Sequence, residues 1–228
     1  MLHFRRGRSS SRMTAPQVLL TAGATRNPID AMRYISARSS GSTGVWLARA
    51  LTARGVVVHL LGSAETLLRA GPDDARSREE FGSTRDLMAR MDRLLREHPG
   101  VAVVHSAAVG DYEAEPRADK IRSGQETLTL TLRPTPKILD HIKLWSPESF
   151  LVSFKAAGPG TTPEGLRALC EGQRARTSSD LVLGNVLGSI GATTAICDPS
   201  GFTPYDDRDA ALATIVNRVA DAVALRRR

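Results

Sequence analysis

The stretch that most constrains the fold of this chain runs over residues 18–44. It begins with a run of three apolar residues, breaks at Gly23, and ends in a Ser- and Gly-rich turn that contains Ser39, Ser40 and Gly41, before a helical pattern that starts at Val45. A strand that leads through such a turn into a helix presents free backbone N–H groups and the positive end of the helix dipole, where phosphates commonly bind. The spacing matches neither G-x-G-x-x-G nor the P-loop, because no Lys follows the last glycine. A second interpretation stays open, in which the glycines only let strand and helix pack closely.

Further apolar runs alternate with helical patterns along the chain, which is typical of an α/β fold. The runs are continuous, as expected for strands that are covered on both faces of a parallel sheet. They cover residues 56–61, 101–104, 150–154 and 180–185. Helical patterns are predicted over residues 76–97, 136–144 and 206–226, and Thr162 is expected to cap a helix that begins at residue 163. We therefore predict a Rossmann-like, doubly wound, mainly parallel sheet.

Three segments indicate less regular structure. Residues 113–125 are polar and carry charges of both signs, so we expect a long loop, either disordered or acting as a lid. Residues 127–132 alternate between polar and apolar side chains, which predicts a strand with one face in water. The strand at 180–185 is expected to be the last of the main sheet, and residues 192–197 and 201–204 are predicted to form a hairpin. A small β-flap on one domain over residues 16–228 accounts for these segments.

The positive charge lies mostly at the two ends of the chain. The formal net charge is +7, and four arginines in the first twelve residues and three at the end supply seven positive charges. The remainder lacks the basic stripe interleaved with aromatic residues that marks a nucleic-acid surface. We expect residues 1–15 to be a disordered basic tail, with Met13 as the sensible first residue.

The two cysteines, Cys170 and Cys197, lie far apart in the sequence and fit no metal-binding spacing. A disulfide scaffold and a Cys-based zinc site are therefore not expected, no protein metal ligands are predicted, and a reducing cytoplasm fits best. No apolar run approaches the length of a membrane span. We expect a cytoplasmic protein without a membrane or nucleic-acid partner.

Six motifs in a fixed order carry a resemblance to one family. They read TAGATRNPIDAMRYISARSSG, HSAAVGDYEAE, DKIRSG, LTLRPTPKIL, LVSFKAA and DLVLGN. This order resembles the phosphopantothenate–cysteine ligases, and with no flavin decarboxylase domain in front the chain is similar to the stand-alone bacterial type. The resemblance implies a homodimer that uses CTP and Mg²⁺. A carboxylate of 4′-phosphopantothenate attacks the α-phosphate to give an acyl-cytidylate and pyrophosphate, and the amine of cysteine then displaces CMP.

The resemblance also implies roles for three charged residues. Lys120, in the DKIRSG loop, matches a lysine over the phosphates, and Arg33 matches a contact to the acyl-nucleotide, for which the arginine fork is well suited. Asp111 matches a residue that holds the nucleotide, and it follows a predicted strand at the edge where open α/β sheets bind ligands. Without the resemblance, these residues are a solvated lysine, a surface arginine and a turn cap.

The other matches concern the nucleotide and the intermediate. Ala108 matches a backbone contact to the intermediate. Phe154 matches an apolar wall against the cytosine, although the residue alone indicates only a core position. Arg176 and Asn185 match a basic residue near the phosphates and the Asn of an AND sequence, which is followed here by Val186. With Gly23, Ser39, Ser40 and Gly41 of the turn, these residues form the predicted binding site.

Ala37 departs from the family in the loop that reads ISN-x-SSG there and ISARSSG here. The family credits that Asn with the second half-reaction, and losing an oxyanion-type donor lowers a rate by about 10²- to 10³-fold. Three interpretations follow. The chain is a divergent ligase in which Asn27, Ser36 or Arg38 replaces the amide, an enzyme with a changed acid or amine, or a catalytically impaired nucleotide-binding protein. An engineered substitution is a further alternative, but drift at other motif positions favours natural divergence.

An NAD(P)-dependent reductase is an alternative from outside the family. It requires a charged residue that reads the ribose after the second strand, where residues 62–65 read GSAE. It also requires a Tyr-x-x-x-Lys or similar pair, and the sequence contains none. We therefore favour the ligase.

Overall fold

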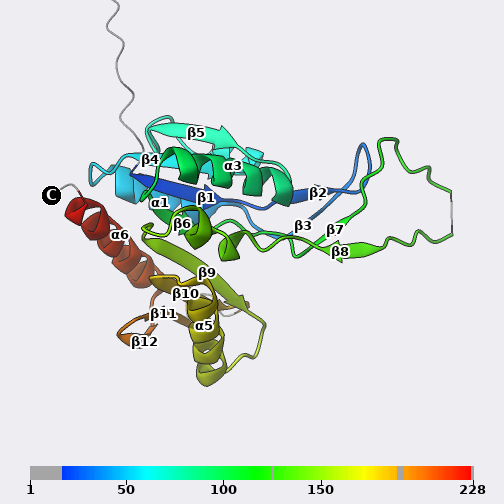
Figure 1. The fold of residues 1–228 in the computed structure, drawn as a ribbon. Helices are drawn as coiled ribbons and strands as arrows, with labels where there is room; N and C mark the ends of the chain where they lie inside the picture. Colours follow the sequence, from blue (N-terminus) through cyan, green and yellow to red (C-terminus); the bar gives the residue numbers. More distant parts are fainter. Residues whose placement is uncertain (1–16, 125, 189–192, 227–228) are drawn as a thin grey trace, which may run out of the picture.

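The computed structural model describes residues 17–124, 126–188 and 193–226, and its centre is one eight-stranded sheet (Figure 1). The strands lie in the order β12-β11-β10-β9-β6-β1-β4-β5. Their bounds are β1 (Val18–Ala22), β4 (Val58–Gly62), β5 (Ser77–Glu80), β6 (Ala102–His105), β9 (Leu151–Ala157), β10 (Leu181–Val186), β11 (Thr194–Asp198) and β12 (Gly201–Tyr205). The strands from β10 to β5 are parallel, which confirms the predicted fold class. The predicted tail at residues 1–15 lies outside the described residues.

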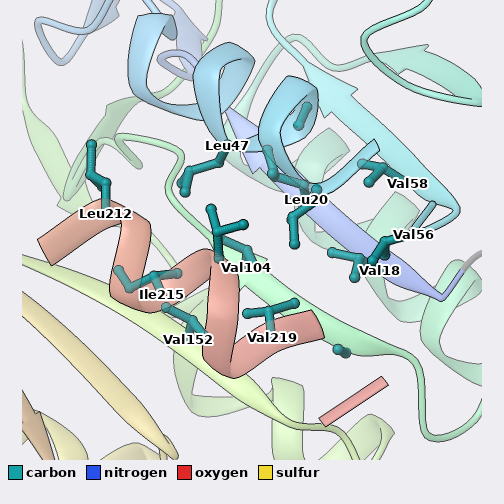
Figure 2. Close-up of a cluster of buried hydrophobic side chains, with 14 of the residues drawn as sticks. Val18, Leu20, Leu47, Val56, Val58, Val104, Val152, Leu212, Ile215 and Val219 are labelled. Atoms are coloured by element: carbon teal, nitrogen blue, oxygen red, sulfur yellow. The ribbon is translucent and has the colours of Figure 1, made fainter. Parts of the chain in front are cut away.

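Helices cover both faces of this sheet. They are α1 (Ser42–Thr52), α2 (Ala64–Arg69), α3 (Thr84–Glu97), η1 (Ile138–Asp140), α4 (Ile142–Trp145), α5 (Pro163–Thr177) and α6 (Arg208–Leu225). On one face, Leu20 of β1 packs in a buried cluster with Leu47 of α1 and Ile215 of α6 (Figure 2). On the other face, Leu19 packs with Met91 of α3. Burial of alternate residues of β1 on opposite faces explains why its apolar run is continuous. Over the described ranges, none of the helices is long and apolar enough to cross a membrane.

The glycines of the turn that follows β1 bring α1 close to the sheet. A Cβ on Gly44 would lie 2.2 Å from the Cβ of Ala22, so a larger residue there would push the helix off the strand. Gly41 precedes the helix with φ of 75°, a conformation that favours glycine. The close-packing interpretation is therefore correct for Gly44. At the start of α1, the N–H of Ser42 donates to the Oγ of Ser40 at 3.4 Å.

Two small antiparallel pairs extend away from the main sheet and form the predicted β-flap (Figure 1). We call them the arms: β2 (Arg26–Pro28) pairs with β3 (Tyr34–Ser36), and β7 (Tyr112–Ala114) pairs with β8 (Leu132–Pro134). The strand predicted over residues 127–132 is wrong up to residue 131, because only Leu132 of that range is paired. Its alternating side chains face no buried layer, so alternation alone does not create a strand there.

Two further predictions were wrong in their boundaries: the start of the helix predicted from residue 76, and the last strand of the main sheet. Residues 76–79 were predicted as helix, but Ser77–Glu80 form the edge strand β5, and α3 begins after Ser83, whose side chain caps the helix. An edge strand leaves alternate side chains in solvent, which suits the charged sequence SREE. The predicted hairpin is confirmed as β11–β12, but it extends the main sheet beyond β10. Thr162 caps α5 as predicted, accepting the N–H of Gly165 at 3.1 Å.

Candidate functional site

Three adjoining cavities open at the carboxyl ends of β1, β6, β9 and β10, and we name each by its lining. The turn cavity, about 360 Å³, is lined by residues 38–44, residues 106–108, Phe154, Ala156, Asn185, Leu187 and Arg208. The lysine cavity, about 210 Å³, includes His105, Ala107, Asp111, Lys137, Phe154, Lys155, Gln173 and Arg176. The arm cavity, about 990 Å³, includes Tyr34, residues 36–40 and Ala108.

The three cavities share residues and so form one continuous site. Ala107 and Phe154 line both the turn cavity and the lysine cavity, while Arg38 and Ala108 line both the turn cavity and the arm cavity. The site lies where the loops after parallel strands meet, the usual ligand position in open α/β sheets. A separate cavity of about 550 Å³ lies at the amino end of β1, beside Gln17, and contains none of the predicted site residues.

The turn cavity is built to hold an anion. The first turn of α1 forms one wall, and its N–H groups carry the positive end of the helix dipole. Arg38 and Arg208 line the same cavity, and no carboxylate among the described residues does. The Nε of Arg208 is buried without a hydrogen-bond partner among the described residues. Burial lowers the pKa of Arg208, because a partly buried guanidinium is less well hydrated than a free one.

Three cations line the lysine cavity. Lys137, Lys155 and Arg176 come from the loop before η1, from β9 and from α5. The Nζ of Lys137 donates to the carboxylate of Asp111, and Arg176 forms an ion pair with Asp140. Such a group of cations beside one carboxylate suits a polyphosphate, which is neutralised by Lys and Arg side chains.

His105 forms the buried floor of the lysine cavity. Its Nδ1 lies 2.9 Å from the Oγ1 of Thr21, which also accepts the N–H of Ala107 at 3.3 Å. Burial lowers the pKa of His105 to about 4, so the ring is neutral at physiological pH. This hydrogen-bond network fixes the end of β6 that faces the ligand.

Gly23 and Ala108 join the ends of β1 and β6. The carbonyl of Gly23 accepts the N–H of Ala108 at 2.8 Å. Gly23 has φ of 94°, and a Cβ there would lie 2.2 Å from the Oγ of Ser63. Gly23 is therefore placed beneath the site, where it positions Ala108, and it is absent from the linings of the three cavities.

Ala37 lines the arm cavity. Asn27, Ser36 and Arg38 were suggested above as substitutes for the amide that Ala37 lacks, and their contacts differ. Both polar atoms of the Asn27 side chain are engaged, because Nδ2 donates to the carbonyl of Tyr112 and Oδ1 accepts the N–H of Thr84, each at 2.9 Å. The hydroxyl of Ser36 donates to the carbonyl of Ala37 at 3.0 Å. Arg38 lines both the arm cavity and the turn cavity, so it is the best placed of the three to reach a ligand.

Arg33 lies in the loop between β2 and β3, Lys120 lies in the loop between β7 and β8, and neither lines one of the three cavities. Arg33 forms an ion pair with Asp30 at 2.9 Å and donates to the carbonyl of Ile121 at 3.3 Å. Lys120 is exposed beside this contact. The structure thus brings these two predicted residues near each other, but away from the turn that binds phosphate in our prediction.

The other predicted residues gather at the cavities, together with residues that the sequence did not single out. Ser39, Ser40, Gly41, Ala108, Phe154 and Asn185 line the turn cavity, while Asp111, Phe154 and Arg176 line the lysine cavity. Lys137, Lys155 and Arg208 were missed. Lys137 belongs to the TPKI motif, so the sequence contained a pattern from which it could have been predicted. Arg208 is a single arginine at the start of a helix, and no sequence pattern marks it.

Among the described residues, no group of three or more His, Cys, Asp or Glu side chains could hold a metal ion. Mg²⁺ is usually held by one or two carboxylates together with substrate phosphates. Asp111, in a cavity suited to a polyphosphate, fits that mode of binding.

The chain is similar to proteins of known sequence and structure. It is 38% identical over 177 residues to the coenzyme A biosynthesis bifunctional protein CoaBC of Thermococcus kodakarensis, covering 77% of this chain and 42% of that relative. It thus spans about two fifths of that relative's length. The DNA/pantothenate metabolism flavoprotein from Streptococcus pneumoniae has the same fold, with a TM-score of 0.80 at 23% identity over 90% of this chain and 98% of that one.

A Cab2 mutant in complex with phosphopantothenate-cysteine also shares the fold, with a TM-score of 0.73 at 18% identity over 94% of this chain and 89% of that one. Residues 13–197 match the family model described as the DNA/pantothenate metabolism flavoprotein C-terminal domain, which is most of the chain. The chain therefore belongs to the family of DNA/pantothenate metabolism flavoprotein C-terminal domains.

Proposed function

We propose that this chain joins 4′-phosphopantothenate to cysteine in a CTP-dependent reaction of coenzyme A biosynthesis. The observation that carries the proposal is the contact between the turn cavity and the lysine cavity at Ala107 and Phe154. Two cation-lined cavities that meet at one wall can hold two phosphorylated substrates with their reacting ends together. The CoaBC relatives, whose names place them in coenzyme A biosynthesis, support a role in that pathway.

In the first half-reaction, the carboxylate of the acid attacks the α-phosphorus of CTP, and the bond to the leaving pyrophosphate breaks. Lys137, Lys155 and Arg176 neutralise the charge that develops on the leaving phosphates. Asp111 would hold Mg²⁺, which when bound neutralises further phosphate charge. Phe154 stands at the junction as an apolar wall against which the base or the mixed anhydride packs.

In the second half-reaction, the amine of cysteine attacks the acyl carbon, CMP leaves, and the ammonium proton is lost to solvent. The arm cavity adjoins the turn cavity at Arg38 and Ala108, so it provides the approach for the amine. Arg38 supplies the donor that Ala37 lacks. The alternatives for Ala37 remain a changed acid or amine, or a binding protein in which catalysis is impaired.

A second copy of the chain is the expected partner, through the arms. The arms and the adjoining loops expose large apolar side chains: Met32, Tyr34, Tyr112, Leu128 and Leu132 are each between 43% and 66% exposed. Apolar side chains gathered on projecting arms favour association. We further place the protein in the cytoplasm, because Cys170 and Cys197 are both free and buried thiols, as a reducing compartment keeps them.

The test is pyrophosphate release with CTP and with ATP, on 4′-phosphopantothenate with and without cysteine, together with the mass of the product. Cysteine-dependent turnover to the amide supports the proposal. About one turnover per site, with a trapped acyl-cytidylate, would show that activation survives and that the natural amine differs. No pyrophosphate release in any mixture would overturn the ligase and favour a non-catalytic role.

A further inference from the structure

The arm cavity contains a pair of opposite charges to which the proposed reaction gives no role. Arg26 of β2 forms an ion pair with Glu65, in the first turn of α2, and both side chains line this cavity. They are 34% and 47% exposed, so a ligand can reach both. Among the described residues that line the cavity, Glu65 is the only carboxylate. A cation and an anion therefore lie side by side on the wall of the cavity through which the amine approaches.

The backbone directs Arg26 into this cavity. Ala24 and Arg26 both line it, whereas Thr25 between them faces the other way, where its Oγ1 accepts the N–H of Gly110 at 2.9 Å. Such alternation is typical of an extended chain. Ala24 forms a β-bridge with Ala108, which lies where the arm cavity joins the turn cavity. Arg26 is two residues further along the extended chain, about 7 Å from this junction.

The ion pair is not needed to hold β2 in place. The backbone N–H of Arg26 donates to the carbonyl of Gly82 at 2.9 Å. The side chain of Asn27 is buried, and it bonds to the backbone of Tyr112 and of Thr84. A partly exposed ion pair adds little to the stability that such buried bonds provide. The position of the pair on a cavity wall is better explained by a ligand than by the fold.

The charges of the pair are complementary to those of a zwitterion. Glu65 contacts one Nη atom of Arg26, and a guanidinium has five N–H groups, so donors remain for a second carboxylate. The ring of Tyr34, whose centroid lies 4.8 Å from the Cζ of Arg26, orients the guanidinium through a cation–π contact. The carboxylate of Glu65 can accept hydrogen bonds from an ammonium group. A carboxylate and an ammonium on one carbon atom, as in an α-amino acid, match both members of the pair.

We propose that Arg26 and Glu65 select an α-amino acid as the amine substrate, with Arg26 binding its carboxylate and Glu65 its ammonium group. The inference deepens the proposed function and rests on it for the reaction. Because Glu65 is about half exposed, the proton that the ammonium group loses before attack can pass to solvent beside it. The free amine then forms its bond to the acyl carbon, and CMP leaves with the electron pair of the broken carbon–oxygen bond.

The test uses three small thiols that differ in charge. L-Cysteine carries both charges, cysteamine only the ammonium group, and 3-mercaptopropionate only the carboxylate. Ligand-observed NMR measures the affinity of the full chain for each thiol without nucleotide, so that no turnover occurs. Arg26→Gln should weaken the binding of cysteine and 3-mercaptopropionate by about 10- to 100-fold, the effect of a hydrogen bond to a charged group, without weakening that of cysteamine. Glu65→Gln should weaken cysteine and cysteamine without weakening 3-mercaptopropionate.

The control variant is Arg85→Gln. Arg85 forms an ion pair with Glu113 of β7 and lines none of the three cavities, so this variant also removes one arginine from a partly exposed pair. It should change no affinity by more than twofold. If the pair of Arg26 and Glu65 only holds the arm in place, R26Q and E65Q should weaken all three thiols alike. That result would overturn the inference.

Turnover separates the inference from the proposed ligase. The wild type should use cysteine with a kcat/KM about 10- to 100-fold above that for cysteamine, and R26Q should remove this preference. Amide formation with equal use of both thiols overturns the inference alone, as does a preference that R26Q retains. Binding of cysteine that depends on Arg26, in a wild type that forms no amide, overturns the ligase and supports the amino-acid site. A wild type that neither binds cysteine nor forms an amide overturns both.

Discussion

The carboxylate of Asp30 accepts the backbone N–H of Ile121 at 3.0 Å, although the two residues lie far apart in the sequence. The same carboxylate pairs with Arg33, which in turn donates to the carbonyl of Ile121 at 3.3 Å. Both backbone groups of Ile121 are thus held by one ion pair. This contact holds the loop between β7 and β8 at Ile121, next to Lys120, and leaves the lysine itself exposed.

Replacement of Asp30 by Asn should loosen this loop. The variant keeps the shape of the side chain but loses the ion pair, so we expect faster amide hydrogen exchange over residues 117–124 and little change elsewhere. If Lys120 acts over the phosphates as predicted, kcat/KM should fall by about tenfold, the loss of one charged contact. Asp119→Asn, which changes an exposed residue of the same loop, is the control. Unchanged exchange in the loop would contradict the role given to Asp30.

The Asp30 contact should also respond to acid in a defined direction. Hydrogen bonds from the N–H groups of Ile121 and Met32 lower the pKa of Asp30 below its ordinary value. A carboxylate with a lowered pKa stabilises the folded state above its unfolded pKa of about 3.9, and this contribution is lost as the pH falls through the folded value. Loop protection should therefore be constant from pH 7 to 5 and fall only below about pH 4.

Replacement of Ala37 by Asn tests the most consequential departure from the family. If Ala37 limits the second half-reaction, A37N should raise cysteine-dependent amide formation by about 10²-fold, because it restores a neutral donor. Pyrophosphate release without cysteine should not change. The matched variant is Arg38→Gln in the chain that retains Ala37. This variant should abolish amide formation if Arg38 supplies the missing donor. A37N without any gain, together with a fully active R38Q, would exclude both residues from the amine step.

Replacement of Lys137 by Gln should weaken nucleotide binding in particular. The variant removes one of three cations from the lysine cavity, so KM for CTP should rise by about tenfold, while KM for the acid stays within twofold. Arg96→Gln removes an exposed cation of α3 that pairs with Asp92, and it should have no effect. A rise in KM for the acid alone would reverse the assignment of the two cavities.

His105 should make the folded state sensitive to mild acid. Burial lowers its pKa to about 4, so between pH 6.5 and 4 the unfolded chain binds more protons than the folded one. The folded state keeps this contribution above pH 6.5 and loses up to about 3 kcal/mol as the pH falls toward 4. Urea unfolding at several pH values should show this slope, and His105→Asn should flatten it. Part of the slope should remain, because burial also lowers the pKa of His59.

Much of the fold was predictable because the central strands are buried on both faces. The continuous apolar runs around Leu20, Val103 and Val152 leave few alternatives to a covered parallel sheet. The edge strand β5 was not predictable, because its sequence, SREE, has no apolar residue and its pairing depends on β4. Residues 127–131 show the converse error. Their alternating polar and apolar side chains predicted a strand, but the segment pairs with no other strand and is a loop.

The residues of the candidate site also divide into those with a local sequence signal and those that only the tertiary structure brings together. The residues around Ser39 and Gly41 could be found because a turn between a strand and a helix has a local sequence signal. Arg208 could not, because it is brought to that turn by α6, which packs across the sheet from a remote part of the sequence. Only the tertiary arrangement reveals that two arginines line a cavity without a carboxylate.

The packing of α6 on β1 also sets the order in which the chain can fold. Leu20 and Ile215 meet in one core, and roughly 200 residues separate them, a contact order that slows folding. At ribosomal speeds of about 5 to 20 residues per second, β1 waits on the order of 10 to 40 s before α6 is synthesised. During that interval α1 alone covers the face of β1 that later packs on α6, so part of this apolar face stays open to water, and we expect the nascent chain to bind chaperones that shield hydrophobic segments.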